Sequence, residues 1–136
     1  MSGSATKPGV KTPIKTSEDY INSLRGRKLK VYLFGELVTD TVEHPLIRPS
    51  INAVAETYLL AEREPELASA VSPFTNERVN RFVHITMNRD DVVLQNKMQR
   101  RLGQLTGTCF QRCVGMAALN ALYSTTFEID EKYRTG

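Results

Sequence analysis

Apolar residues recur every three or four positions in four stretches of the chain, the spacing at which side chains share one face of an α-helix. The four stretches are residues 17–25, 49–63, 91–105 and 108–123. Residues that favour a helix start precede or open three of them: Thr16 or Ser17, Pro49, and Asn88 or Asp90. Gly26 and Gly107 follow the first and third stretches, and glycine commonly ends a helix. The pattern predicts a mainly α-helical fold.

Each predicted helix carries an apolar face that we expect to pack inward. In the first three helices the inward residues are Tyr20, Ile21 and Leu24, then Ile51, Val54, Ala55, Tyr58 and Leu59, then Val93, Leu94, Met98 and Leu102. The fourth helix is apolar around most of its circumference. It therefore needs burial on nearly every side.

Between these helices the pattern changes. Residues 29–38, LKVYLFGELV, gather β-branched and aromatic side chains around a glycine, which predicts one short β element, a strand or a bent hairpin. Residues 41–50 hold two X-Pro steps and are expected to form a structured loop. A short helical turn is expected at about residues 66–70. Residues 1–16 lack apolar periodicity, so we predict a disordered leader before one helical domain at residues 17–136.

The composition is that of a globular domain, because 136 residues with 40% hydrophobic side chains can bury a core. No stretch approaches the roughly 18 apolar residues of a membrane span, and no secretory signal is recognisable at the start. A cytoplasmic location without a membrane partner is expected. The net charge of +3 belongs to Lys7, Lys11 and Lys15, because the other basic residues equal the acidic ones in number. With no clustered positive excess, a nucleic-acid partner is not expected.

The two cysteines, Cys109 and Cys113, are four residues apart within the fourth predicted helix. That spacing places both side chains on one face with Cβ atoms roughly 5–6 Å apart, so one metal centre could bind both thiolates. Two inert buried cysteines are the alternative that the spacing leaves open, since free cysteine is among the most buried residue types. A disulfide is disfavoured because parallel side chains on one helix do not readily reach its torsion angle.

A complete iron–sulfur or zinc site normally has four ligands, and the only imidazoles of the chain are His44 and His84. Nothing in the spacing connects them to the cysteines. We expect His44 to hydrogen bond within a loop and His84 to be partly buried and satisfied. The remaining ligands must then come from outside this chain. Gln111 and Arg112 are polar residues of an apolar helix, so each is expected to find a structural partner, Arg112 at a domain or subunit contact.

The run KMQRRLGQLTGTCFQRCVGMAALNALYSTTFEIDEKYRTG, residues 97–136, strongly resembles the segment of 4-hydroxybutyryl-CoA dehydratases that supplies two cysteines to their cluster. Upstream, EDYINSLRGRKLKVYLFGELV and HPLIRPSIN resemble the same family and the flavin-dependent 4-hydroxyphenylacetate hydroxylases. The resemblance covers about residues 17–136. It implies the helical amino-terminal domain of a fold like that of acyl-CoA dehydrogenases. The later β domain and helical bundle are absent from this chain, and the intact family forms homotetramers.

In this family three cysteines and one histidine hold a 4Fe-4S cluster, and the motif carries two of these positions onto Cys109 and Cys113. The resemblance further implies FAD as a cofactor, conversion of 4-hydroxybutyryl-CoA to crotonyl-CoA, and isomerisation of vinylacetyl-CoA. That dehydration breaks an unactivated C–H bond, which no side-chain base does directly near neutral pH. We expect this chain alone to be inactive and to need the remaining domains or a partner subunit. An apolar patch around residues 108–123 should then be exposed.

Two other functions remain open at this point. The chain could be the amino-terminal part of a 4-hydroxyphenylacetate 3-monooxygenase-type hydroxylase, which shares the GEL and HPLIRP neighbourhoods but has no cluster. The CFQRC run argues against that function. A noncatalytic remnant or interaction module is the third possibility, because most flavin contacts and catalytic groups are expected beyond Gly136.

Overall fold

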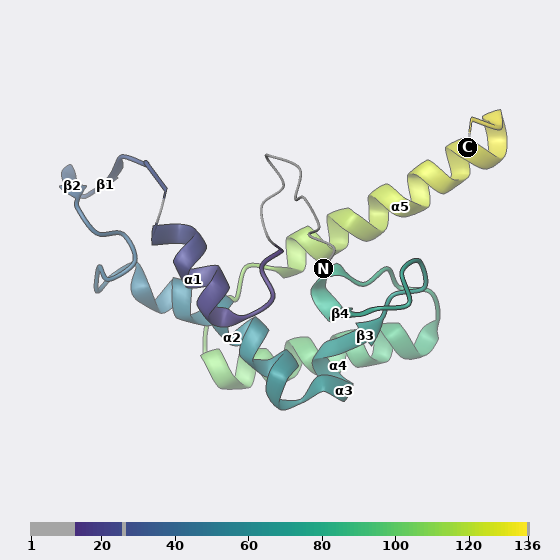
Figure 1. Ribbon diagram of the computed structural model, residues 1–136, viewed down its shortest axis with the longest axis horizontal. Coiled ribbons are helices and arrows are strands. Elements are labelled where there is room, and N and C mark those ends of the chain that lie inside the picture. The colour runs from purple at the N-terminus through teal and green to yellow at the C-terminus, as the bar shows by residue number, and fades with distance from the viewer. Residues whose placement is uncertain (1–12, 26, 136) are drawn as a thin grey trace, which may run out of the picture.

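The computed structural model describes residues 13–25 and 27–135. The predicted leader up to residue 12 and the predicted helix end at Gly26 lie outside the described residues. Within them, helices alternate with two short antiparallel hairpins. The predicted mainly α-helical fold with a short β element is confirmed (Figure 1).

The first helix, α1 (Ser17–Arg25), is capped by Thr16, as predicted. Thr16 Oγ1 accepts a hydrogen bond from Asp19 N at 3.0 Å, and Asp19 Oδ2 accepts one from Thr16 N at 3.0 Å. This reciprocal pair satisfies two backbone donors at the helix start. Tyr20 stacks on Tyr58 of α2 (Arg48–Arg63) with ring centroids 5.7 Å apart, so the predicted apolar face of α1 meets α2.

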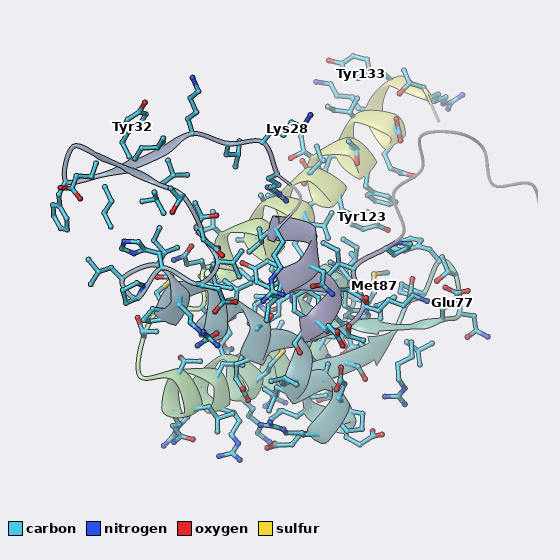
Figure 2. All side chains as sticks on the ribbon, turned by 60° about the vertical axis from the view of Figure 1, so that its left-hand side comes forward. Lys28, Tyr32, Glu77, Met87, Tyr123 and Tyr133 are labelled. Atoms are coloured by element: carbon cyan, nitrogen blue, oxygen red, sulfur yellow. The ribbon has the colours of Figure 1, made fainter. Side chains whose placement is uncertain are left out.

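A hairpin of β1 (Val31–Leu33) and β2 (Glu36–Val38) occupies the segment in which a β element was predicted. Phe34 and Gly35 form its two-residue turn with φ angles of 52° and 85°, the positive values that a tight hairpin turn requires. The hairpin projects from the helical body (Figure 1), and apolar side chains such as Tyr32 (Figure 2) remain exposed on it.

The core lies where α2, α3 (Pro65–Ala68) and α4 (Arg89–Thr106) meet. Its buried apolar side chains are Leu60, Ala68, Phe82, Met98, Leu102, Phe110 and Met116. Met98 and Leu102 confirm part of the face predicted for α4, whereas Val93 is exposed and Leu94 only half-buried. The amino-terminal turns of α4 therefore extend past the core.

The buried face of α2 is shifted from the predicted one. Thr57 and Leu60 are buried, whereas Val54 and Leu59, which the periodicity favoured, are half-buried. The reason is that α2 packs against α1 and also against α3 and α4. Periodicity identifies a wide apolar stripe, but the partners decide which part of that stripe is covered.

The helical turn predicted at residues 66–70 ends earlier, at the last residue of α3. The next residues form β3 (Ser69–Val71), which pairs with β4 (Arg78–Asn80) in a hairpin absent from the sequence-based prediction. Arg78 Nη1 donates to Ser69 Oγ at 2.9 Å, and Arg81 Nη2 donates to the Ser69 carbonyl at 2.6 Å. These contacts join residues distant in the chain, so no local pattern reveals the strand.

Both ends of α4 are formed by residues that the sequence indicated. Asn88 Oδ1 accepts a hydrogen bond from Asp91 N at 3.0 Å, which caps the start of the helix. Gly107 closes the other end in the left-handed conformation, with a φ of 61°. Before α4, the short 3-10 helix η1 (Arg81–Val83) follows β4.

The last helix, α5 (Cys113–Tyr133), begins later and continues further than predicted. It could not begin near residue 108, because Gln111 has a left-handed φ of 58°. In Figure 1, α5 extends away from the helical body, and Met116 is its only buried residue. The predicted exposed apolar patch is confirmed, since Val114 is 75% exposed and Leu122 63% exposed. None of the helices in the described part of the chain is long and apolar enough to cross a membrane.

Candidate functional site

The segment between α4 and α5 is a short loop fixed at both ends. Gly107 turns the chain out of α4, and the hydroxyl of Thr106 lies 2.9 Å from the carbonyl oxygen of Thr108. Phe110 is buried and meets Phe82 edge-on, with ring centroids 5.7 Å apart. The loop is therefore anchored to the core by one aromatic side chain and returns to helical geometry at α5.

This loop corrects the predicted placement of the cysteines. Cys109 lies in the loop and is exposed, whereas Cys113 is the first residue of α5 and is half-buried against the core. They do not share a face of one helix, because the left-handed backbone of Gln111 separates them. Gln111 is exposed and lies outside any helix, which contradicts its predicted place on the fourth helix. Both cysteines are free of any disulfide, as predicted.

The described residues contain no group of three or more His, Cys, Asp or Glu side chains that could hold a metal ion. His44 is a loop residue whose Nδ1 accepts a hydrogen bond from Leu46 N at 3.3 Å, which confirms its expected role. The expectation that His84 is partly buried and satisfied is wrong, because its side chain is buried in a different cluster and neither ring nitrogen makes a hydrogen bond there. Neither histidine lies in the cysteine segment.

Arg112, next to Cys113, finds partners within the described part of this chain. Its guanidinium carbon lies 4.5 Å from the ring centroid of Tyr58 and 4.8 Å from that of Phe82. Its Nη1 donates to Thr57 Oγ1 at 2.8 Å. Burial lowers the pKa of Arg112 from its ordinary value, and Tyr58 and Tyr20 oppose that shift only in part.

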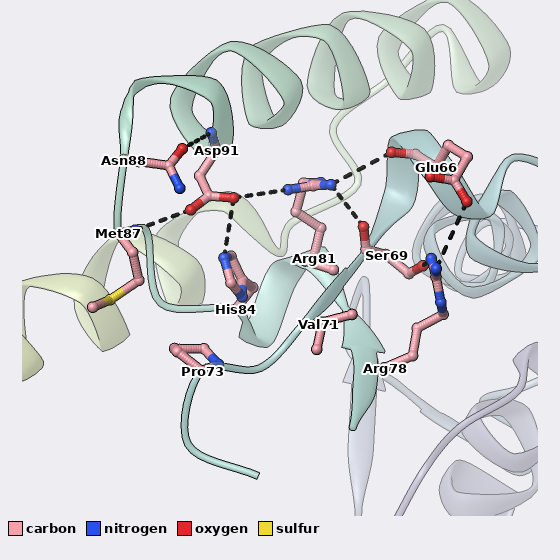
Figure 3. A pocket seen from close by; sticks show the side chains of 11 residues that line it. Glu66, Ser69, Val71, Pro73, Arg78, Arg81, His84, Met87, Asn88 and Asp91 are labelled. Atoms are coloured by element: carbon pink, nitrogen blue, oxygen red, sulfur yellow. Dashed lines mark hydrogen bonds and ion pairs between the residues drawn. The ribbon is translucent and has the colours of Figure 1, made fainter. Parts of the chain in front are cut away.

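A charged cluster that the sequence did not indicate lies at the junction of β3, η1 and α4 (Figure 3). Arg81 is 5% exposed and His84 6% exposed. Arg81 Nη1 lies 3.6 Å from Asp91 Oδ1, and His84 Nε2 lies 3.2 Å from the same oxygen. Arg81 also donates to the Leu67 carbonyl at 2.8 Å, so the cluster joins α3 to α4.

The electrostatics of this cluster centre on Asp91. Burial opposes its ionisation, yet the Met87 N–H and the neighbouring His84 and Arg81 hold the pKa of Asp91 below its ordinary value. Two basic side chains share one carboxylate oxygen, and neither contact has hydrogen-bond geometry. The shallow cavity beside the cluster has a volume of about 340 Å³. The cluster links α4 to α3 and to the residues around η1.

Comparison with known proteins identifies the group to which this chain belongs. The family described as "4-hydroxyphenylacetate 3-hydroxylase N terminal" matches residues 16–136. The chain belongs to this family. Its match covers the loop and both cysteines as well as the helical core. The predicted resemblance is therefore confirmed at the level of the family.

Individual members of the family are similar to different extents. The chain is 50% identical to the 4-hydroxybutyryl-CoA dehydratase/vinylacetyl-CoA-Delta-isomerase of Clostridium aminobutyricum over 125 residues, 90% of this chain and 25% of that protein. It is 34% identical over 70 residues to the 4-hydroxyphenylacetate 3-monooxygenase oxygenase component of Geobacillus sp. (strain PA-9), 52% of this chain and 14% of that protein.

A solved structure gives the same picture. The oxygen-tolerant archaeal 4-hydroxybutyryl-CoA dehydratase from N. maritimus is 70% identical to this chain, with a TM-score of 0.84. The match covers 90% of this chain and 25% of the dehydratase. The chain thus spans about a quarter of the length of the dehydratases that it matches, and the predicted fold of an amino-terminal helical domain is confirmed.

Proposed function

We propose that this chain is the amino-terminal part of a dehydratase that converts 4-hydroxybutyryl-CoA to crotonyl-CoA, with vinylacetyl-CoA isomerase activity. In this proposal Cys109 and Cys113 supply two ligands to a 4Fe-4S cluster. The observation that carries it is the pair of free cysteines in one short loop-to-helix segment of a chain 50% identical to such an enzyme.

The chemistry of these side chains fits the cluster as half of its ligand set. Thiolates are the usual ligands of iron–sulfur clusters, and four ligand positions have to be filled. Cys109 is exposed, and Cys113 lies at the start of a 21-residue helix, where the helix dipole favours a negatively charged group. The other two ligands would come from segments outside this chain, since neither His44 nor His84 lies with the cysteines.

The contribution of this chain would be to hold the two thiolates in place. Phe110, buried against Phe82, and Arg112, bonded to Thr57, fix the segment on either side of Gln111. FAD, when bound, supplies the one-electron chemistry that the dehydration requires. We assign no residue of this chain to FAD. The acyl-CoA substrate, the cytoplasmic location and assembly as a homotetramer belong to the same proposal.

The test uses the complete enzyme that contains this chain, purified without oxygen. We expect Cys113→Ala and Cys109→Ala each to remove most of the iron and acid-labile sulfide together with the dehydratase activity. Val114→Ala is the matched control, because its side chain is exposed beside Cys113 and carries no donor atom. Iron content, the visible absorption of the cluster and crotonyl-CoA formation are measured for each variant.

Two results would contradict the proposal. Retention of iron and activity by both cysteine variants would remove the ligand assignment. An intact parent enzyme that contains flavin but no iron or acid-labile sulfide would favour the alternative, a flavin-dependent aromatic hydroxylase, to which the match with the Geobacillus oxygenase component points. Reconstitution of the 136-residue chain alone should give little stable cluster, because half of the ligands are missing.

A further inference from the structure

A cavity of about 480 Å³ lies between α2, β4 and residues 13–15, and Arg112 forms part of its wall. Its walls are mainly apolar and include Tyr58, Ala61, Val79 and Val83. Small-molecule sites are commonly of this size and combine apolar walls with a few fixed polar groups. Of the two guanidinium groups that line the cavity, Arg78 has a carboxylate partner in Glu66, whereas Arg112 has none among the described residues.

The guanidinium of Arg112 is held in a fixed orientation. The rings of Tyr58 and Phe82 lie 4.5 and 4.8 Å from its central carbon, so the planar group is in contact with two aromatic rings. Its Nη1 donates to Thr57 Oγ1, and Thr57 is itself only 1% exposed. A fixed guanidinium loses little conformational entropy when a ligand binds.

The remaining donors of Arg112 have no acceptor among the described residues. No carboxylate there lies within 4.0 Å of its guanidinium, and residues 1–12 contain no Asp or Glu. None of its other N–H groups is both buried and without a hydrogen-bond partner. They therefore reach solvent-accessible space at a cavity that Arg112 lines.

The charges around the cavity limit which anion it suits. The charged lining residues are Lys15, Glu62, Glu77, Arg78 and Arg112. Arg78 is directed towards Glu66 at 3.7 Å and donates to Ser69 Oγ. At most one positive charge is left unbalanced, which suits a monoanion better than a dianion.

We propose that this cavity binds a small carboxylate with an apolar body, whose carboxylate pairs with Arg112. The planar guanidinium matches a carboxylate in a bidentate pair, and the apolar walls cover the hydrocarbon part of the ligand. The cavity shares Arg112 with the cysteine segment, but its lining includes neither Cys109 nor Cys113. The inference does not depend on the iron–sulfur proposal.

The probe is radiolabelled hexanoate, and its binding to the 136-residue chain is measured by equilibrium dialysis, which tolerates association of the protein. We expect saturable binding with competition by unlabelled hexanoate. Hexanamide, which has the same body without the charge, should compete at least about tenfold more weakly. Acetate and inorganic phosphate should also compete more weakly, because neither has a hydrocarbon body to fill the apolar part of the cavity.

Three variants locate the site. Arg112→Gln should weaken hexanoate binding at least about tenfold. Val83 is 52% exposed and lines the cavity, so Val83→Glu should weaken binding by charge repulsion without disturbing the core. Val114→Glu, on exposed α5 and away from the cavity, is the matched control and should bind as the unmodified chain does. Circular dichroism checks that each variant keeps its helices.

Specific results overturn the inference. It is wrong if hexanamide or phosphate competes as well as hexanoate, or if hexanoate does not bind. It is also wrong if a folded Arg112→Gln variant binds unchanged. Should that variant lose its helices, the two glutamate variants decide the question. Equal binding by Val83→Glu and Val114→Glu then rejects the cavity as the site, and selective loss with Val83→Glu supports it.

Discussion

At the scale of single residues, the buried side chain of Arg81 connects several elements of the fold. Arg81 and Asp91 form a buried contact at 3.6 Å, and Arg81 further donates to the carbonyls of Leu67 and Ser69. The buried guanidinium thereby supplies hydrogen-bond donors to backbone carbonyl groups at the end of α3 and the start of β3. Removal of either partner would leave the other charge buried and uncompensated.

Asp91 makes the stability of the chain depend on pH at the acidic end. Its pKa in the folded chain is lower than the ordinary 3.8. The stabilisation is therefore fully present above about pH 3.8 and is lost as the pH falls through the lower, folded value. We expect the difference in free energy of unfolding between the unmodified chain and Asp91→Asn to shrink across that window. Urea denaturation at a series of pH values measures it, and a difference that grows on acidification would contradict the assignment.

At the scale of secondary-structure elements, the caps define the helices more sharply than their apolar faces do. In α4, Asn88 caps the start and Gly107 closes the end, while the apolar face is covered only in the carboxy-terminal part. Because a cap is a contact within four residues, its signal is complete in the local sequence. Which part of an apolar face is buried depends on the elements packed against it, so the local sequence alone does not predict it.

The cap of α4 can be tested by substitution. Asn88→Ala removes the side-chain oxygen that accepts from Asp91 N, and it should lower the free energy of unfolding by about 1 kcal/mol. Asn96→Ala is the control, because Asn96 is exposed within α4, where alanine is the better helix former. Chemical denaturation followed by circular dichroism compares the two. Equal stability of both variants would show that the cap contributes nothing measurable.

At the scale of the whole molecule, α5 leaves several large apolar side chains exposed to solvent. Val114, Leu122 and Phe127 are each more than half exposed, and the helix stands away from the body in Figure 1. Large apolar side chains exposed along one helix favour association in water. Its only aromatic contact outside α5 is between Tyr123 and Phe74, at a centroid distance of 5.4 Å within the described residues.

We expect the chain by itself to associate at modest concentration. Light scattering across a dilution series should show an average mass that rises with concentration. The double variant Leu122→Ser with Phe127→Ser should shift that rise to higher concentration, because it removes apolar surface without adding charge. Thr125→Ser, at an exposed position of the same helix, should leave it unchanged. A monomer at all concentrations would contradict this expectation.

The sequence by itself determined the features whose physical cause is local or repetitive. The Thr16 and Asn88 caps, the turn at Phe34 and Gly35, and the helical class all follow from contacts within a few residues or from a regular apolar period. The family resemblance rests on the same local runs. These features were predictable because no distant part of the chain takes part in them.

Only the tertiary structure decided the features that need a distant partner. The periodicity predicted a helix from about residue 108, but packing of Phe110 on Phe82 and the left-handed backbone of Gln111 delay its start, so the cysteines do not share a helix face. The hairpin of β3 and β4 is accompanied by side-chain contacts that Arg78 and Arg81 make with Ser69, nine and twelve residues earlier in the chain. Such contacts are invisible in a local pattern, because their energy is gained only after the intervening chain has folded back.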